Sequence, residues 1–300
     1  MGEQQQTKRT DHGLRILAPA KINLSLLVAD KRPDGFHEIE TIMTKVNWFD
    51  EILIQSGTRP GIELVCEGPC WAPAGPDNLV YRACRQFMNT MGLEADLRVI
   101  LRKNIPAGAG LGSASSDAAA TLIGLTEYLQ FSLSRRQLKK LAPLLGSDVA
   151  FFLGGPLAFC TGRGEKIRKS GKGFKFAALL ILPDVSVSTE KVYANFKPDA
   201  SRYQVLSGRI RDYIEKNRID LAAGMCANML ETSCFELYRE LAKLKAEVNS
   251  LGIRPLCLSG SGSAMFWITQ AADMQTAQHY RQQIQMKTGC KAFVVSNNRW

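Results

Sequence analysis

The feature that most constrains the fold is a glycine-rich turn between a predicted strand, residues 97–101, and a predicted helix. The turn contains Gly108, Gly110 and Gly112, and apolar residues then recur at helical spacing over residues 118–129. Glycines allow a backbone to approach a ligand closely, and the N–H groups at a helix start attract anions. The pattern therefore indicates a phosphate-binding site, while a tight structural turn is the alternative interpretation.

The turn does not match the common phosphate-binding motifs. A P-loop requires Lys followed by Ser or Thr after its last glycine, but here Ser113 and Ala114 follow. A dinucleotide-binding fold needs an acidic residue at the end of a second strand, whereas Glu127 lies within the predicted helix. The His-Arg-Asp and Asp-Phe-Gly signatures of protein kinases are absent from the sequence.

Length and composition predict a globular chain with room for one large domain or two ordinary ones, since it has 300 residues, of which 45% are hydrophobic. No apolar run approaches the ~20 residues of a membrane span, and the start has no signal-peptide pattern. We therefore expect a cytoplasmic protein without a membrane partner. The 8 cysteines are scattered and are expected to be reduced there. With only 3 histidines, no metal-ligand set is predicted.

Strand and helix patterns mix along the chain and predict an α+β fold. A strand of alternating character over residues 22–28 is followed by a turn, a returning strand over 38–47 and a further strand over 51–55. The basic, glycine-rich stretch 162–175 is expected to form a solvated hairpin and the junction between domains 1–165 and 166–300. It does not match an RNA-recognition strand, because Lys175 stands where that motif has a small residue.

Two charged residues outside the turn are candidates for chemistry. Lys21 and Asn23 share the polar face of the first strand, and Asp148 precedes a short apolar helix. A kinase that acts on an alcohol requires a carboxylate near the hydroxyl and a cation that offsets developing charge. Lys21 and Asp148 would supply both. A solvated strand lysine and an N-cap aspartate are the alternative interpretation.

Four segments carry a resemblance to known enzymes, and the first three are similar to the three motifs of the GHMP kinase superfamily. They are residues 19–24, the glycine turn with residues 115–119, residues 258–263, and residues 32–39. The last segment is similar to that of the 4-diphosphocytidyl-2-C-methyl-D-erythritol kinases of the non-mevalonate isoprenoid pathway. The resemblance runs from about residue 17 to 295, which is nearly the whole chain.

The resemblance implies an N-terminal, ATP-binding half like ribosomal protein S5 domain 2 and a ferredoxin-like C-terminal half, with the active site between them. It implies a kinase that phosphorylates the 2-hydroxyl of the methylerythritol moiety, with Asp148 as the base and Lys21 as its cationic partner. Asn78 and Lys103 are expected near the nucleotide. Mg²⁺ is expected with ATP, and Ser116 is a candidate ligand. The residues expected to hold the ATP phosphates are Pro106, Ala107, Gly108, Ala109, Gly110, Leu111, Gly112, Ser113, Ala114, Ser115 and Ser116.

The same resemblance places the cytidine against Phe36 and His37, because a pyrimidine needs flat apolar faces and polar edge partners. Tyr193 is expected as the opposing ring and Thr189 as a nearby polar contact. Asn23 is expected to help place the substrate.

The sequence departs from the family pattern at two places. Phe36 stands where many relatives have Tyr, which removes a hydroxyl and keeps the stacking face. Ser113 and Ala114 stand where most relatives have glycines, which predicts a bulkier phosphate loop.

Two alternative functions stay open at this point. One is another GHMP kinase, acting on mevalonate-type or homoserine-type substrates, although segment 32–39 is not usual there. The other is a basic nucleic-acid-binding module, which the net charge of +10 would suit. The Lys21 and Asp148 motifs argue against nucleic acid as a partner, and the sequence predicts no oligomeric state.

Overall fold

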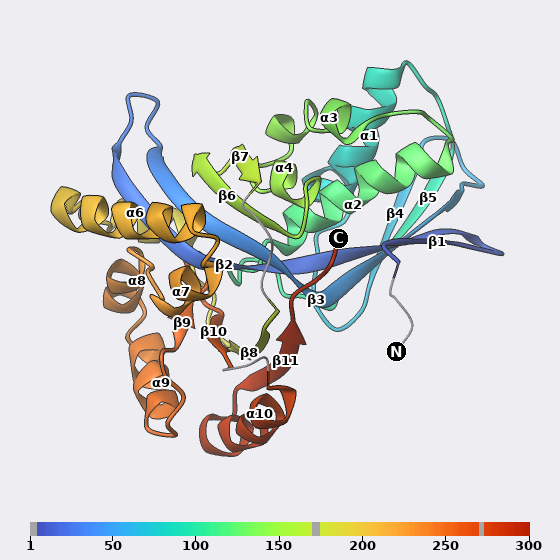
Figure 1. Ribbon diagram of the computed structural model, residues 1–300. Helices are drawn as coiled ribbons and strands as arrows, with labels where there is room; N and C mark the ends of the chain where they lie inside the picture. The colour runs from blue at the N-terminus through green and yellow to red at the C-terminus, as the bar shows by residue number, and fades with distance from the viewer. Residues whose placement is uncertain (1–4, 170–174, 270–272) are drawn as a thin grey trace.

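Two sheets organise the chain in the computed structural model, which describes residues 5–169, 175–269 and 273–300 (Figure 1). The larger sheet has the order β1-β2-β3-β5-β4, and β6 pairs with both β3 and β7. Its strands are β1 (Thr7–Thr10), β2 (Gly13–Lys31), β3 (His37–Ser56), β4 (Ile62–Glu67), β5 (Leu97–Arg102), β6 (Leu157–Gly162) and β7 (Lys166–Lys169). The smaller sheet has the order β11-β8-β10-β9, formed by β11 (Lys291–Ser296), β8 (Ala177–Leu182), β10 (Met265–Ile268) and β9 (Cys257–Leu258).

The larger sheet is built around β3, which pairs with β2 on one edge. On its other edge, residues 39–44 pair with β6 and residues 51–56 pair with β5. The prediction of two strands over 38–47 and 51–55 is therefore wrong in its division, since one strand runs through both. The β2–β3 register shifts between Pro19 and Ala20 and between Asn23 and Ser25. Such irregularities bend a strand and accommodate a proline that cannot donate to the ladder.

Four helices cover one face of the larger sheet: α1 (Leu79–Met91), α2 (Ser113–Tyr128), α3 (Arg135–Leu138) and α4 (Val149–Phe152) (Figure 1). Apolar side chains of α1, α2 and α4, such as Phe87, Leu122 and Phe151, are buried against the sheet. Burying a side chain of this size contributes roughly 1.5–3 kcal/mol. This face of the sheet therefore forms the core beneath the glycine turn.

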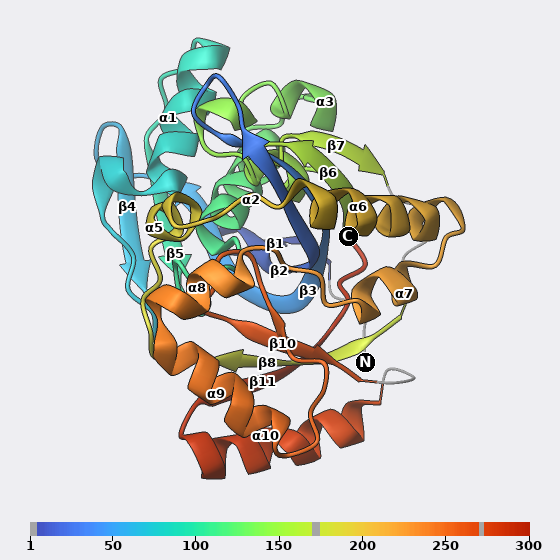
Figure 2. The same cartoon turned by 90° about the vertical axis from the view of Figure 1, so that its left-hand side faces the viewer.

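The C-terminal part contains α5 (Thr189–Ala194), α6 (Ala200–Glu215), α7 (Ile219–Gly224), α8 (Glu231–Leu237), α9 (Arg239–Asn249) and α10 (Met274–Thr288). Figure 2 shows α9 and α10 on one side of the smaller sheet, and Figure 1 shows α6 crossing the β2–β3 hairpin. Glu40 of β3 is buried and ion-pairs with Arg211 of α6, while Ser207 donates a hydrogen bond to it at 2.8 Å. These contacts join α6 to the larger sheet.

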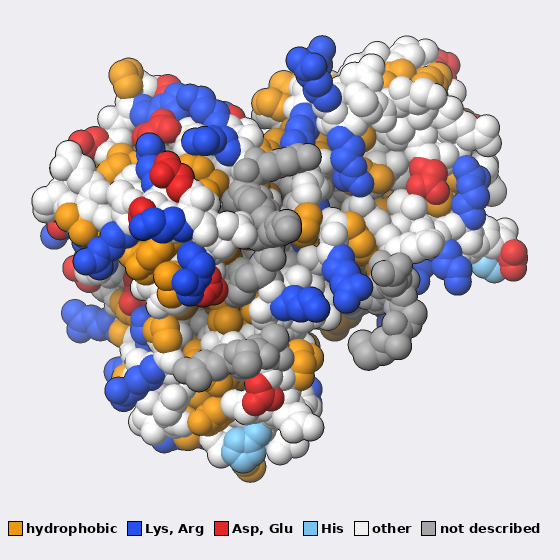
Figure 3. Space-filling view, in the orientation of Figure 1, with side chains coloured by type: hydrophobic (Ala, Val, Ile, Leu, Met, Phe, Trp, Pro, Cys, Tyr) orange, Lys and Arg blue, Asp and Glu red, His pale blue; other side chains and the backbone are white. Residues whose placement is uncertain are grey.

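The expected basic hairpin is present as β6 and β7, which pair around a turn at residues 163–165. Lys172 and the rest of residues 170–174 lie outside the described part of the chain. On the face drawn in Figure 3, Lys and Arg side chains are spread over the surface with acidic side chains among them. Within the described ranges, no helix has the length and apolar character needed to cross a membrane.

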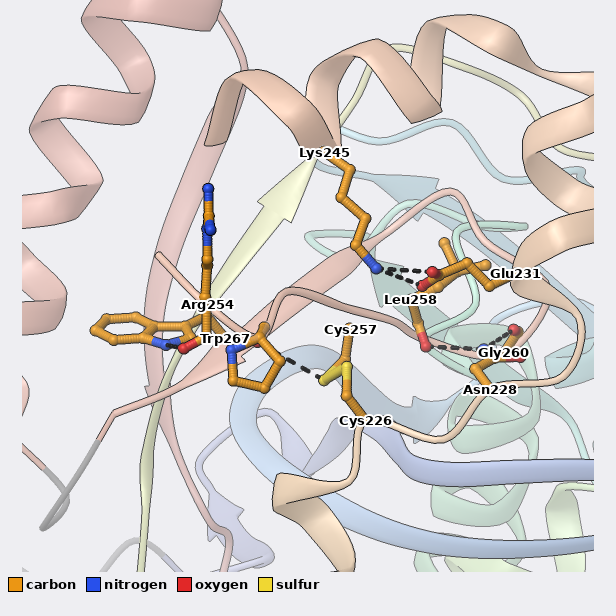
Figure 4. The surroundings of a disulfide bond; sticks show 10 residues. Cys226, Asn228, Glu231, Lys245, Arg254, Cys257, Leu258, Gly260 and Trp267 are labelled. Atoms are coloured by element: carbon orange, nitrogen blue, oxygen red, sulfur yellow. Dashed lines mark hydrogen bonds and ion pairs between the residues drawn. A yellow bond between two sulfur atoms is a disulfide. The ribbon is translucent and has the colours of Figure 1, made fainter. Parts of the chain in front are cut away.

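The expectation that every cysteine is reduced is wrong for one pair. Cys226, just after α7, and Cys257, at the start of β9, form a disulfide across a sequence separation of 31 (Figure 4). Their Cα atoms lie 5.3 Å apart, within the range that a disulfide requires. Tertiary packing brings the two residues together, so their spacing in the sequence carried no signal.

Candidate active site

The glycine turn (residues 108–112) lies between β5 and α2, as predicted. Gly108, Gly110 and Gly112 have φ angles of 73°, 77° and 68°, in the left-handed region that favours glycine. Gly112 is the N-cap residue of α2. The backbone N–H of Lys21 donates to the carbonyl oxygen of Leu111 at 2.9 Å, which joins the turn to β2.

A second loop from the C-terminal half packs directly on this turn. We call residues 259–263 the serine loop. Ser259 Oγ donates to the carbonyl oxygen of Gly110 at 2.9 Å, and Ala264 N donates to that of Ala109 at 3.1 Å. A Cβ atom on Gly110 would lie 2.1 Å from the carbonyl oxygen of Ser259. Gly110 is therefore required by the contact between the loops as well as by its backbone conformation.

The serine loop is held in turn by the segment after the disulfide. Asn228 Nδ2 donates to the carbonyl oxygens of Leu258 at 2.9 Å and Gly260 at 2.8 Å (Figure 4). Thr189 Oγ1 lies 2.8 Å from Ser261 Oγ, so the predicted substrate contact is hydrogen-bonded to the same loop. The serine loop thus joins the glycine turn to α5 and to the segment between α7 and α8.

Lys21 and Asp148 are brought together beside the turn. Lys21 Nζ lies 3.8 Å from Asp148 Oδ2, and the lysine side chain is 5% exposed, whereas the aspartate side chain is 31% exposed. Burial lowers the pKa of Lys21, and the charge of Asp148 opposes that effect. Asp148 is the N-cap residue of α4, but its side chain makes no capping hydrogen bond. Its carboxylate is thus available to a ligand beside a buried cation.

Asn23 extends this pair into a polar row on β2. Its Oδ1 accepts a hydrogen bond from Lys21 Nζ at 2.5 Å, and its Nδ2 donates to Thr41 Oγ1 at 2.8 Å. Its backbone N–H donates to Ser259 Oγ at 3.3 Å. Thr41 and Ser259 were not predicted as site residues. Thr41 could have been found from its place on the strand that returns beside Asn23, and Ser259 from its place in the third motif.

The residues expected around the cytidine lie at the start of β3 and on α5. The ring centroids of His37 and Tyr193 are 5.8 Å apart and the ring planes are tilted by 38°, so the two rings contact each other; their place around a cytidine stays a prediction. Burial, with a further contribution from the Asp148 charge, raises the pKa of Tyr193. Phe36 is 53% exposed, and the Arg163 guanidinium lies 4.5 Å from the centre of its ring. One face of Phe36 is therefore covered by a cation.

Lys103 is buried behind the turn. Its Nζ ion-pairs with Asp50 and with Asp117, the latter at 2.7 Å, and it donates to Ser113 Oγ at 2.8 Å. Burial raises the pKa of Asp117 well above its usual range, Lys103 opposes that rise, and the Asp50 charge adds to it. The Lys103 side chain is 2% exposed, and its placement near the nucleotide stays a prediction.

Two further residues from the ATP prediction have clear local roles. Asn78 is the N-cap residue of α1, where its Oδ1 accepts from Val80 N at 2.9 Å. Ser113 is buried against Lys103, whereas Ala114 is exposed. The Ser113 side chain thus fills the ion cluster below the turn.

Comparisons with known proteins identify the family of the chain. A family model described as GHMP kinases N terminal domain matches residues 78–156, and one described as GHMP kinases C terminal matches residues 210–283. A solved 4-(cytidine 5'-diphospho)-2C-methyl-D-erythritol kinase is similar with a TM-score of 0.75 and 29% identity, covering 95% of this chain and 100% of that chain. The homoserine kinase of Cytophaga hutchinsonii shares the fold, with a TM-score of 0.74 and 18% identity over 100% of this chain and 96% of that chain.

Two curated relatives narrow the family assignment. A 4-diphosphocytidyl-2-C-methyl-D-erythritol kinase of Pelotomaculum thermopropionicum is 37% identical over 262 residues, which cover 87% of this chain and 90% of the relative. The protein of that name from Bacillus subtilis is 35% identical over 259 residues, covering 86% of this chain and 89% of the relative. The resemblance seen in the motifs is thereby confirmed: the chain belongs to the 4-diphosphocytidyl-2-C-methyl-D-erythritol kinase family of the GHMP kinases.

Proposed function

We propose that the protein is a cytoplasmic kinase that transfers the γ-phosphoryl group of ATP to the 2-hydroxyl of 4-diphosphocytidyl-2-C-methyl-D-erythritol. The observation that carries the proposal is the placement of Lys21 Nζ 3.8 Å from Asp148 Oδ2, beside the glycine turn. Phosphoryl transfer to an alcohol needs a group that takes the hydroxyl proton and positive charge near the transferred oxygens. This pair supplies both in one place.

In the proposed reaction, Asp148 accepts the proton of the 2-hydroxyl as its oxygen attacks the γ-phosphorus. The bond from that phosphorus to the β,γ-bridging oxygen breaks, and ADP leaves. Lys21 stays protonated and offsets the negative charge on the transferred group. Asn23 fixes the lysine by accepting its hydrogen bond at 2.5 Å. The N–H groups of the glycine turn and of the start of α2 bind the phosphates of ATP.

His37 supports the proposal of a cytosine site. Its Nδ1 lies 2.7 Å from the carbonyl oxygen of Ala29. A carbonyl oxygen only accepts, so Nδ1 carries the proton, and in the neutral ring Nε2 is an acceptor. Such an acceptor suits the exocyclic amino group of cytosine. Tyr193, with Thr189 near it, closes the other side of this site in the proposal.

Mg²⁺ enters the proposal with ATP, where it would neutralise phosphate charge. Oxygen donors are the ligands it prefers. The buried Ser116 Oγ and Asp117 Oδ1 have no hydrogen-bond partner among the described residues. Ser116, at the start of α2, is therefore the side chain we assign to the metal.

We also propose that the two halves are an S5 domain 2-like domain, residues 1–165, and a ferredoxin-like domain, residues 166–300. The separate four-stranded sheet with α9 and α10 on one side supports the second assignment. The larger sheet extends to β7, Lys166–Lys169, so it continues slightly past this proposed boundary.

The test is ATP consumption with 4-diphosphocytidyl-2-C-methyl-D-erythritol, with homoserine and mevalonate as competing substrates. The wild type should turn over the cytidine compound, and Asp148→Asn should lose about 10²–10⁴-fold in kcat, the usual contribution of a general base. His37→Ala should raise KM for the cytidine compound with little change in kcat. Turnover of homoserine or mevalonate in its place would overturn the substrate assignment, and a fully active Asp148→Asn would overturn the mechanism.

A further inference from the structure

Lys45 is a buried lysine of β3 that the proposed reaction does not use. Its relative exposure is 0%, and within the described ranges it forms no ion pair with a carboxylate. Its Nζ donates to the carbonyl oxygens of Phe152 at 2.9 Å and Gly154 at 3.0 Å, and lies 5.8 Å from the centre of the Phe151 ring. Burying an ammonium group without a counter-ion is costly, so these contacts call for an explanation.

The carbonyl groups that Lys45 binds stand at the C-terminal end of α4. Helix ends leave carbonyls without intrahelical partners, and cationic side chains satisfy them well. Arg135 Nη1 donates to the intervening carbonyl oxygen of Leu153 at 3.4 Å. Three consecutive carbonyls therefore accept hydrogen bonds from two cationic side chains.

The other end of the same short helix carries Asp148. The Asp148 carbonyl oxygen accepts from Phe151 N at 3.1 Å and Phe152 N at 3.3 Å. Phe152, whose carbonyl oxygen accepts from Lys45, is thus one helical turn away from Asp148. A shift at one end of so short an element is passed to the other end.

Phe152 also contacts the rest of the site. A Cβ atom on Gly112 would lie 3.0 Å from two ring carbons of Phe152 and 3.0 Å from Cγ of Lys21. Lys21 and Lys45 are direct partners in the β2–β3 register. The hydrogen bond from Lys45 to Phe152 therefore fixes a residue that is packed where the glycine turn, β2 and α4 meet.

We propose that Lys45 is a positioning residue for phosphoryl transfer, which holds the end of α4 so that Asp148 stays opposite Lys21. This inference rests on the proposed role of Asp148. A lysine that merely fills the core would affect folding and leave the catalytic step of the folded enzyme unchanged. The two roles therefore predict different effects of a Lys45 substitution on kcat.

The charge on Lys45 changes within the range in which the enzyme can be assayed. Burial lowers the pKa of Lys45 to about 7, and the charges of Arg135 and Lys139 add to this effect. Lys21 is the charged residue opposite it on β2. A charged donor makes a stronger hydrogen bond than a neutral one, so Lys45 should hold α4 best at the acid side of this range.

The experiment measures kcat and both KM values for wild type, Lys45→Met, Asp148→Asn and the double variant. Lys140→Met is the control, because Lys140 is an exposed lysine next to Lys139 in the sequence. Lys45→Met should lower kcat about tenfold through misplacement of Asp148, with both KM values within about twofold. In the Asp148→Asn background, Lys45→Met should add little. An unchanged kcat, or the same loss in both backgrounds, would overturn the proposal.

A pH series gives a second readout. The ratio of wild-type kcat to Lys45→Met kcat should be largest near pH 6 and fall toward pH 8.5, whereas a ratio independent of pH contradicts positioning by the charged group.

If Lys45→Met does not fold, Lys45→Gln keeps one amide donor and should give an intermediate kcat; full kcat in folded Lys45→Gln overturns the proposal. An inactive Asp148→Asn beside a fully active Lys45→Met would refute this inference alone, and an active Asp148→Asn would refute the mechanism on which it rests.

Discussion

The contact between the serine loop and the glycine turn predicts different effects for two similar substitutions. Gly108 and Gly110 have nearly the same backbone conformation, with φ of 73° and 77°. An alanine at either position is strained by about 1–2 kcal/mol. A Cβ atom on Gly108 meets nothing within 4 Å, whereas on Gly110 it would lie 2.1 Å from the Ser259 carbonyl oxygen. Relieving that overlap should cost a further ~1–3 kcal/mol. Gly110→Ala should therefore destabilise the protein by about 2–5 kcal/mol and Gly108→Ala by about 1–2 kcal/mol.

Urea unfolding of both variants measures this difference, and steady-state kinetics measure its effect on the site. KM for ATP should rise more in Gly110→Ala than in Gly108→Ala, because only the former displaces the serine loop from the turn. Equal losses of stability and equal KM values for ATP in the two variants would refute the claim that this contact shapes the turn.

Three further predictions concern buried charge and the disulfide. The folded-state pKa of Lys45 is about 7, against an ordinary value of 10.5. Between these two pH values the unfolded chain binds more protons than the folded chain. Lys45 therefore makes the free energy of unfolding rise with pH, by up to roughly 1.4 kcal/mol per pH unit. Lys45→Met should flatten that rise in urea titrations at several pH values, and parallel curves would contradict the assignment. Lys103→Met leaves two buried carboxylates without their cation and should cost about 3–5 kcal/mol in the same assay, with a loss below 1 kcal/mol arguing against a buried ion cluster. Cys226→Ser should cost about 3.7 kcal/mol without reductant, from the loop that Cys226 and Cys257 close, and nothing when wild type is also reduced; an equal loss in both conditions would show that packing, rather than the crosslink, is responsible.

Much of the fold could be predicted where local chemistry and tertiary structure agree. The strand before the turn, the turn itself and the helix after it are present because glycines and helical periodicity act locally. The division of β3 into two strands, which left out Asp50 between them, was wrong. Asp50 is 0% exposed, and its Oδ1 accepts hydrogen bonds from Asn104 N at 2.6 Å and Ile105 N at 2.8 Å. Its partners lie more than fifty residues away, so the sequence pattern could not reveal them.

The candidate site shows the same limit. Lys21 and Asp148 could be paired in advance only because the chemistry of a kinase needs both, and no spacing in the sequence joins them. The third motif could have marked Ser259 as a site residue, but its bond to Gly110 could not be predicted. The role of Lys45 could not be predicted either, since a lysine in a strand is ordinary on its own. Each acquires its role from a carbonyl oxygen on a distant segment, Phe152 for the lysine and Gly110 for the serine.

The serine loop has a consequence for how such enzymes can be recombined. The turn that would bind the phosphates is encoded before residue 113, yet its shape depends on a hydrogen bond and a close backbone approach from residues 259–262. An N-terminal half grafted onto another kinase's C-terminal half inherits its nucleotide affinity from both parents. Chimeras that change substrate preference should therefore exchange the segment at 32–39 and α5 while leaving the serine loop with its own turn.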